Sequence, residues 1–218
     1  LQALDSTTGF PALYEEMFGN PWRRAVDVEP LFPSNLAQPD MQLPFLIGTR
    51  WSYTGGPHGA WEKEGSWAGI DFAPASTVSG CVESDAWVTA SAAGVIARSE
   101  RGIVVLDLDG DGFEQTGWAL VYLHIATEDR IDVREWVEPG EYLGHPSCEG
   151  GRATGTHIHM ARKYNGEWMA ADGPIPFVLS DWHVQSAGEP YQGYLVRGDE
   201  VITASQVGNY DSRIERQE

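Results

Sequence analysis

The stretch TGTHIHMARKYNG, residues 154–166, decides the fold class. Residues 156–162 are typical of a β-strand, and the Asn165-Gly166 pair that follows is a strong signal for a tight hairpin turn. Because side chains alternate along a strand, His157 and His159 project from the same face. The stretch therefore predicts an antiparallel β structure in which two imidazoles share one surface.

Further short strands are expected on both sides of this segment. They fall at 86–98, 102–107, 118–124, 137–144 (a turn and a short strand) and 191–204 (a hairpin turning at Gly198-Asp199). The 25 Gly and 13 Pro also favour a turn-rich β protein. We expect a mainly β fold, an antiparallel β-sheet or sandwich domain with long loops around a groove, like a duplicated hybrid motif.

The pattern divides the chain into three parts. Residues 1–44 form an irregular N-terminal arm, in which residues 10–17 favour a short helix and later prolines break any regular element. A remnant of an inhibitory pro-segment is an alternative for this arm. Residues 45–177 form the main β domain, and residues 178–218 form a C-terminal extension with a β-hairpin.

Charge and composition exclude several classes of partner. The chain has 32 Asp and Glu against 14 Lys and Arg, a net charge of −18, so nucleic acid is not an expected partner. No stretch approaches the eighteen or more apolar residues of a membrane span. The chain opens on Leu1 without an initiator Met, which we interpret as a processed or trimmed product, an interpretation compatible with removal of a signal peptide.

The two cysteines, Cys81 and Cys148, do not form a CxxC pair, which excludes a cysteine-based zinc site. Two interpretations of these cysteines remain: a disulfide between them, or a pair of buried free thiols.

The six histidines are few enough to weigh singly. Two imidazoles on one strand face are costly to bury unless a metal ion organises them, and neutral imidazole is the commonest metal ligand. Alone, the HxH pair is a weak signal. Three more residues strengthen it: His58 in a Gly-rich stretch, Asp71, and His124 at the end of an apolar strand.

The motifs TGGPHG (54–59), GIDFAP (69–74), YLH (122–124) and TGTHIH (154–159) together resemble the LytM/lysostaphin-type zinc metallopeptidases, most closely their β-lytic branch. The likeness covers about residues 45–177, and VEPGEYLG (137–144) looks like a hairpin of the same family. Most of the family places its first histidine four residues before the aspartate, where this chain has Trp67. The β-lytic branch places it about a dozen residues earlier, as His58 is placed here.

The resemblance implies that residues 45–177 are a zinc metallopeptidase domain in which His58, Asp71 and His159 bind zinc. His124 and His157 become the catalytic pair, which would hydrogen-bond the water and the developing oxyanion or pass a proton to the leaving amine. The implied function is a secreted endopeptidase, extracellular or in the cell envelope, that hydrolyses peptidoglycan peptides at a cross-bridge or a stem-peptide crosslink. Alternatives are a general extracellular metalloprotease and a non-catalytic cell-wall-binding module of the same fold.

Other features have competing interpretations. In DLDGDGFE (107–114), Asp107, Asp109 and Asp111 have the spacing of a calcium loop, but Trp118 stands where that loop needs Glu, so an acidic hairpin turn is the alternative. AAGVIARSE (92–100) followed by VEPGEYLG (137–144) resembles lipoyl and biotinyl carrier domains, but the stretch between them has no Lys to modify. His145 and His183 are expected outside the site. Four aromatic residues either line a groove or pack in the core: Tyr53, Trp61, Trp67 and Trp118.

Overall fold

The computed structural model describes residues 14, 16–17, 32–61, 65–76 and 78–217. The chain has two compact units, Leu1–Leu36 and Ala37–Glu218. The helix expected over residues 10–17 and the interpretation of the chain start lie largely outside the described residues. The second unit carries all the strands described below.

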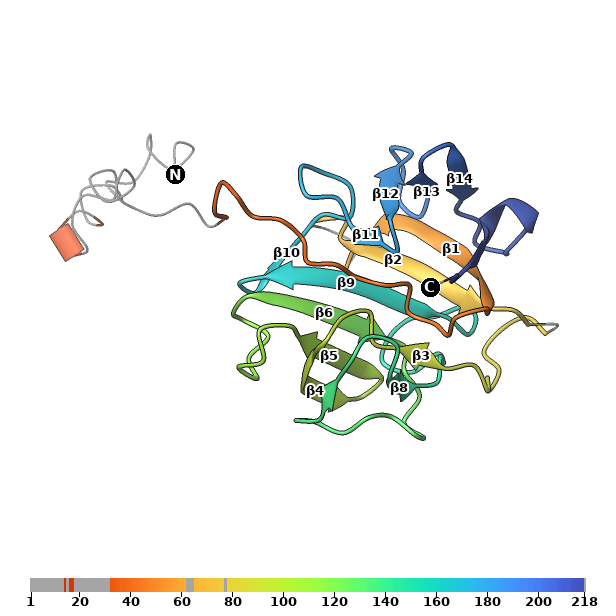
Figure 1. Cartoon of the computed structure of the whole chain (residues 1–218), viewed down its shortest axis with the longest axis horizontal. Helices are drawn as coiled ribbons and strands as arrows, with labels where there is room; N and C mark the ends of the chain where they lie inside the picture. Colours follow the sequence, from red (N-terminus) through yellow and green to blue (C-terminus); the bar gives the residue numbers. More distant parts are fainter. Residues whose placement is uncertain (1–13, 15, 18–31, 62–64, 77, 218) are drawn as a thin grey trace. The chain divides into compact units, whose positions relative to one another are not determined.

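The second unit is built almost entirely from antiparallel strands, which confirms the predicted fold class (Figure 1). The largest sheet has the order β15-β1-β2-β9-β6-β5-β4-β7, with β10 paired to β9. Its strands are β1 (Arg50–His58), β2 (Gly69–Pro74), β4 (Gly94–Glu100), β5 (Ile103–Asp107), β6 (Trp118–Leu123), β7 (Trp136–Val137), β9 (Ile158–Tyr164), β10 (Glu167–Trp168) and β15 (Arg213–Glu215).

Two smaller sheets complete the unit. One is a four-stranded sheet of β11 (Val178–Leu179), β12 (Trp182–Ser186), β13 (Gly193–Arg197) and β14 (Glu200–Thr203). The other pairs β3 (Val88–Thr89) with β8 (Tyr142–Gly144). A 3-10 helix, η2 (Tyr210–Ser212), precedes β15. No helix of the described residues is long and apolar enough to cross a membrane.

The central strands β5 and β6 are buried along their whole length. Alternate side chains of these strands belong to two hydrophobic cores. Val105 and Val121 pack on one face of the sheet, whereas Val104 and Leu120 pack on the other. This double burial explains why both segments read as continuous apolar runs instead of alternating ones.

Two of the three expected hairpins are confirmed. The third, over residues 137–144, is not formed, because β7 pairs with β4 and β8 pairs with β3. Tyr164 pairs with Glu167 across the Asn165-Gly166 turn, and both turn residues have positive φ (49° and 80°), as a two-residue I′ turn requires. In the C-terminal part, Arg197 pairs with Glu200 across Gly198-Asp199.

Residues just before β1 pack into the same unit as the strands. Met41 and Leu43 are buried in the main core, and the Gln38 amide oxygen accepts a hydrogen bond from the guanidinium of Arg162. Arg162 is fully buried and also donates to the carbonyl oxygens of Pro176 (2.9 Å) and Ala170 (3.0 Å). Burial lowers the pKa of Arg162 to about 9. These neutral acceptors tie the chain before β1 to the segment that follows β10.

Candidate metal centre

Four neighbouring strands, in the order β1, β2, β9 and β6, bring the predicted histidines and the aspartate together (Figure 1). His58 is the last residue of β1, and Asp71 of β2 lies directly opposite His159 of β9. Strand β6 ends at Leu123, which pairs with His159, and His124 follows. Residues far apart in the sequence therefore meet at one place on the sheet.

Asp71 lies at the centre of this group. Its Oδ1 is 3.0 Å from Nδ1 of His159 and 3.3 Å from Nε2 of His58, and these two nitrogens are 3.0 Å apart. All three residues are at most 6 % exposed. The three atoms form a compact triangle of two nitrogens and one carboxylate oxygen, a group that can hold a metal ion.

The second nitrogen of each of these imidazoles is committed elsewhere. His58 Nδ1 is 2.8 Å from the Gly56 carbonyl, and His159 Nε2 is 2.9 Å from the Ala60 carbonyl. A carbonyl can only accept, so each of these nitrogens carries the hydrogen. The lone pairs of His58 Nε2 and His159 Nδ1 therefore face each other, an arrangement that repels unless a cation lies between them.

The triangle fits zinc. Tetrahedral Zn–N and Zn–O bonds of about 2.0 Å require ligand atoms about 3.3 Å apart, close to the three separations observed here. Three protein ligands also leave the fourth position that a catalytic zinc needs. The two carbonyl partners fix the ring orientation, as outer partners of zinc-binding histidines do.

Two glycines make room for the group. A Cβ on Gly69 would lie 2.2 Å from Cε1 of His159, and a Cβ on Gly55 would lie 2.4 Å from Oδ2 of Asp71. Any larger residue would displace a ligand side chain. The glycines of the TGGPHG and GIDFAP motifs are therefore part of the site through their lack of a side chain.

The electrostatics of the group favour a cation. Burial alone would raise the pKa of Asp71, but the hydrogen bonds that His159 and His58 donate to it when their rings are protonated hold it well below its usual range. Burial would lower the pKa of His58, yet the hydrogen bond and charge of Asp71 raise it above its ordinary value. The carboxylate stays ionised in a buried place and attracts positive charge, whether a proton or a metal ion supplies it.

His124 and His157 lie beside this triangle. Their ring centroids are 4.5 Å apart, and His157 Nε2 is 3.9 Å from Asp71 Oδ1. Both Nδ1 atoms contact backbone carbonyls, those of Glu149 (2.7 Å) and Gly155 (2.8 Å), so both Nε2 atoms lack hydrogens when the rings are neutral. Burial and the neighbouring His157 lower the pKa of His124 to about 4.

The five residues lie in a groove of about 2490 Å³. Trp61 and Trp67 line it, as one of the two interpretations of these residues expects, whereas Tyr53 and Trp118 are buried.

Sequence reasoning missed Tyr191, whose ring stacks on His58 with centroids 4.0 Å apart. Its backbone bonds to β1 through Gly56, whose N–H donates to the Tyr191 carbonyl (2.9 Å). Its positive φ of 67° is a structural sign of constraint that no sequence pattern reports.

The remaining predicted residues lie elsewhere. His145 contacts Trp87, with ring centroids 3.9 Å apart, and His183 is exposed on β12. Asp107, the last residue of β5, forms a second group with Asp109 and Asp111 of the loop that follows, and their oxygens lie within 4.8 Å of one another. Cys81 and Cys148 are joined in a disulfide, with Cα atoms 5.8 Å apart, so the disulfide interpretation is confirmed.

An all-β protein with a buried His–Asp–His group beside two further histidines has the form of a metallopeptidase. The chain is 30 % identical over 147 residues to protease LasA of Pseudomonas aeruginosa, a match that covers 65 % of this chain and 32 % of LasA. It is 26 % identical over 186 residues to β-lytic metalloendopeptidase of Achromobacter lyticus, covering 79 % of this chain and 43 % of that protein. The chain thus spans less than half the length of these two curated relatives.

Among solved structures, the deep-sea M23 metalloprotease pseudoalterin has the same fold, with a TM-score of 0.64 and 24 % identity. The match covers 77 % of this chain and 96 % of that one. No family model matches the chain. This likeness shows the fold, and the sequence relatives agree with the resemblance drawn from the motifs. The chain is therefore similar to peptidases of the LytM/lysostaphin (M23) type.

Proposed function

We propose that the chain is a zinc-dependent endopeptidase that hydrolyses peptide bonds in bacterial peptidoglycan. The observation that carries the proposal is the triangle of His58 Nε2, Asp71 Oδ1 and His159 Nδ1, with two further imidazoles beside it in an open groove. The relatives named as a protease and a metalloendopeptidase support the reaction class. The motifs quoted above support the cell-wall substrate.

In this mechanism His58, Asp71 and His159 hold the metal. Zinc, when bound, supplies Lewis-acid activation of water and of the scissile carbonyl. The peptide lies in the groove, where Trp61, Trp67 and Tyr191 line its path. The remaining chemistry falls to the two histidines outside the triangle.

His124 and His157 handle protons and charge. Each holds its Nδ1–H on a backbone carbonyl, which leaves Nε2 to accept a hydrogen bond from water or a proton. Once protonated, either ring can donate to the developing oxyanion or to the leaving amine. Tyr191, stacked on His58, is a positioning residue that restricts the orientation of that ligand.

The division of the chain follows from this proposal. Residues 45–177 are the peptidase domain, residues 1–44 an arm, and residues 178–218 an extension that adds Tyr191 to the groove wall. We further propose a location outside the cytoplasm, extracellular or in the cell envelope. The Cys81–Cys148 disulfide supports this location, because disulfides persist mainly in oxidising compartments.

Calcium binding by Asp107, Asp109 and Asp111 is a separate proposal. Its support is the proximity of the three carboxylates and the raised pKa of Asp107, about 6, caused by burial and by the neighbouring Asp109. An unchanged melting temperature with and without calcium would remove these residues from consideration.

The function is tested with metal analysis and turnover on one sample purified without chelators. We expect near-stoichiometric zinc, loss of turbidity in a cell-wall suspension, and new amino groups in the soluble fraction. Dialysis against a chelator should abolish lysis, and zinc should restore it. Cleavage of casein without wall lysis would indicate a general metalloprotease, and wall binding without new amino groups would indicate a non-catalytic module.

A further inference from the structure

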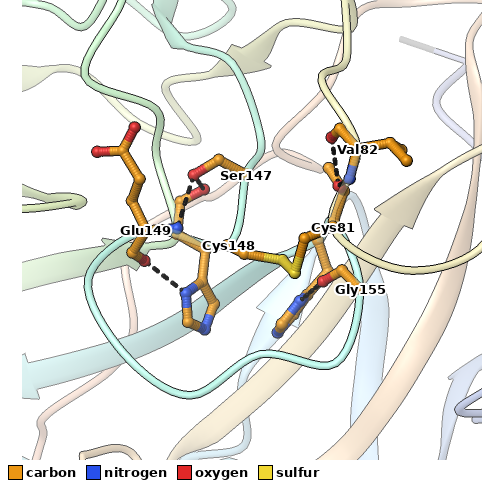
Figure 2. The surroundings of a disulfide bond; sticks show 9 residues. Cys81, Val82, Ser147, Cys148, Glu149 and Gly155 are labelled. Atoms are coloured by element: carbon orange, nitrogen blue, oxygen red, sulfur yellow. Dashed lines mark hydrogen bonds between the residues drawn. A yellow bond between two sulfur atoms is a disulfide. The ribbon is translucent and has the colours of Figure 1, made fainter.

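One short segment, Ser147–Glu149, contacts both His124 and His157, the two catalytic histidines of the proposed site. Figure 2 shows this segment beside the disulfide. The Ser147 N–H and hydroxyl both donate to the His124 carbonyl, at 2.7 and 3.0 Å. The His157 N–H donates to the Ser147 carbonyl (3.3 Å), and His124 Nδ1–H donates to the Glu149 carbonyl (2.7 Å). The position of this segment therefore sets the backbone of both histidines and the ring orientation of one.

A second set of hydrogen bonds joins Thr156, the residue before His157, to residues 80–82. The Thr156 N–H donates to the Gly80 carbonyl (3.1 Å). The Thr156 hydroxyl donates to the Val82 carbonyl (2.5 Å) and accepts from the Val82 N–H (2.9 Å). Thr156 immediately precedes His157, so this contact holds the backbone from which His157 projects.

The disulfide closes the arrangement. Cys81 lies between Gly80 and Val82, and its bond to Cys148 ties residues 80–82 to the segment that holds His124 (Figure 2). Three pieces of chain, residues 80–82, 147–149 and 155–157, are thus joined in a ring of one covalent bond and several hydrogen bonds. We call these three pieces the histidine clamp.

His124 needs such a clamp. Its φ is +69°, in the left-handed region that residues other than glycine rarely adopt. Such a conformation persists only where the surrounding structure determines it from several sides. Two hydrogen bonds from Ser147 to the His124 carbonyl hold the backbone in this conformation. The residue is also buried, with an exposed fraction of 2 %.

We propose that Thr156 and the Cys81–Cys148 disulfide are positioning elements. They hold the backbone and rings of His124 and His157 where catalysis requires them, without contributing to metal binding. The inference rests on the proposed function, because it assigns a role to groups that serve those two histidines. None of the clamp residues supplies an atom to the His58–Asp71–His159 triangle. Loosening the clamp should therefore slow turnover while leaving the metal in place.

The first test compares Thr156→Val, which loses both hydroxyl hydrogen bonds in a nearly isosteric side chain, with Thr156→Ser, which keeps the hydroxyl. On a quenched-fluorescent peptide that the wild-type chain cleaves, kcat should fall about 10- to 100-fold in Thr156→Val. KM and zinc content should stay within about twofold of wild type, and Thr156→Ser should restore most of kcat. The matched control is Thr49→Val, which removes a hydroxyl that donates to the Leu46 carbonyl. Thr49 lies just before the start of β1, whereas His58 is the last residue of that strand.

The second test removes the covalent link with the Cys81→Ala/Cys148→Ala double variant. It should show the same loss of kcat at constant zinc. Combined with Thr156→Val, it should lose less than the product of the two separate losses, because both act through one clamp. Wild-type kcat in Thr156→Val, or a loss explained by missing zinc, would overturn the inference.

A readout independent of turnover separates this inference from the proposed function. Long-range nitrogen–proton NMR of the imidazoles should show single Nδ1–H tautomers for His124 and His157 in the zinc-loaded wild type. Thr156→Val should show tautomer mixtures or faster exchange of these protons, whereas Thr156→Ser and Thr49→Val should not. An inactive wild type would refute the proposed function, while unchanged imidazole spectra in Thr156→Val would refute the clamp.

Discussion

The His58–Asp71–His159 triangle and the Asp107–Asp109–Asp111 loop are two candidate metal sites built in opposite ways. The triangle joins residues up to 101 positions apart through paired strands, whereas the loop takes its carboxylates from five consecutive residues. In the triangle, histidines lower the pKa of the carboxyl. In the loop, burial and a second carboxylate raise the pKa of Asp107 to about 6.

The difference concerns preorganisation. The triangle places mixed nitrogen and oxygen donors at fixed separations, with each imidazole anchored on a backbone carbonyl. The loop places like charges together, which repel in the absence of a cation. Removing part of the triangle should therefore affect function, whereas changing the loop should affect mainly stability.

The largest effect is expected for His159→Ala. It removes one of three ligand atoms, so zinc affinity should fall by about 100-fold or more, since loss of even an outer partner costs 10- to 100-fold. Wall lysis should disappear with the metal. Asp109→Ala in the loop is the matched change and should leave zinc content and lysis as in wild type. Equal zinc loss in both variants would erase the distinction between the two sites.

His124→Ala should come next. The side chain lies beside the triangle and supplies proton transfer without holding metal, so kcat should fall about 10²- to 10⁴-fold at normal zinc content. Zinc analysis and peptide cleavage on the same preparation measure both quantities. Retained turnover would remove His124 from the catalytic pair but would leave the metal site as proposed.

Gly69→Ala tests the space around the triangle. The added Cβ would lie 2.2 Å from Cε1 of His159, so that ring or its strand must shift. We expect a loss of about 1–3 kcal/mol of unfolding free energy, as overpacking usually costs, together with weaker zinc binding. Gly173→Ala, whose Cβ would meet only the Ala170 Cβ at 3.9 Å, should be close to neutral. Urea unfolding and zinc titration measure the two effects.

The smallest effect is a pH dependence in the loop. With its pKa raised from 3.8 to about 6, Asp107 binds more protons in the folded than in the unfolded chain between these values. Its favourable contribution to stability is therefore present at low pH and is lost as the pH rises through about 6. Without divalent ions, Asp107→Asn should be more stable than wild type at pH 7, by about 1 kcal/mol, and equal to it near pH 4.

Added calcium should reverse the order at pH 7 by stabilising only the wild-type loop. Urea unfolding of both chains at several pH values, with chelator or calcium, measures the difference. A wild-type chain that is already the more stable one in chelator at pH 7 would contradict the repulsion assigned to the loop.

Much of the site was predictable because its signals are local. The two-residue period of a strand places His157 and His159 on one side, and both lie within 3.9 Å of the same carboxylate oxygen. The Asn165-Gly166 turn was predictable because few residue pairs accept positive φ at both positions. The position of His58 was harder to predict, because β1 contains two register shifts between Tyr53 and His58 that no alternation reveals.

The sequence by itself determined the central strands β5, β6 and β9, two hairpin turns and the residue types able to bind metal, since these depend on neighbours within a few positions. It did not reveal β1, β11 or β12. The tertiary structure decided which strands are adjacent, brought Tyr191 onto His58, and set the tautomer of each imidazole. Those tautomers follow from the carbonyls of four backbone positions: Gly56, Ala60, Glu149 and Gly155. Every residue has a backbone carbonyl, so the residue type does not show which carbonyl will accept a hydrogen bond from an imidazole. These partners are known only once the chain has folded.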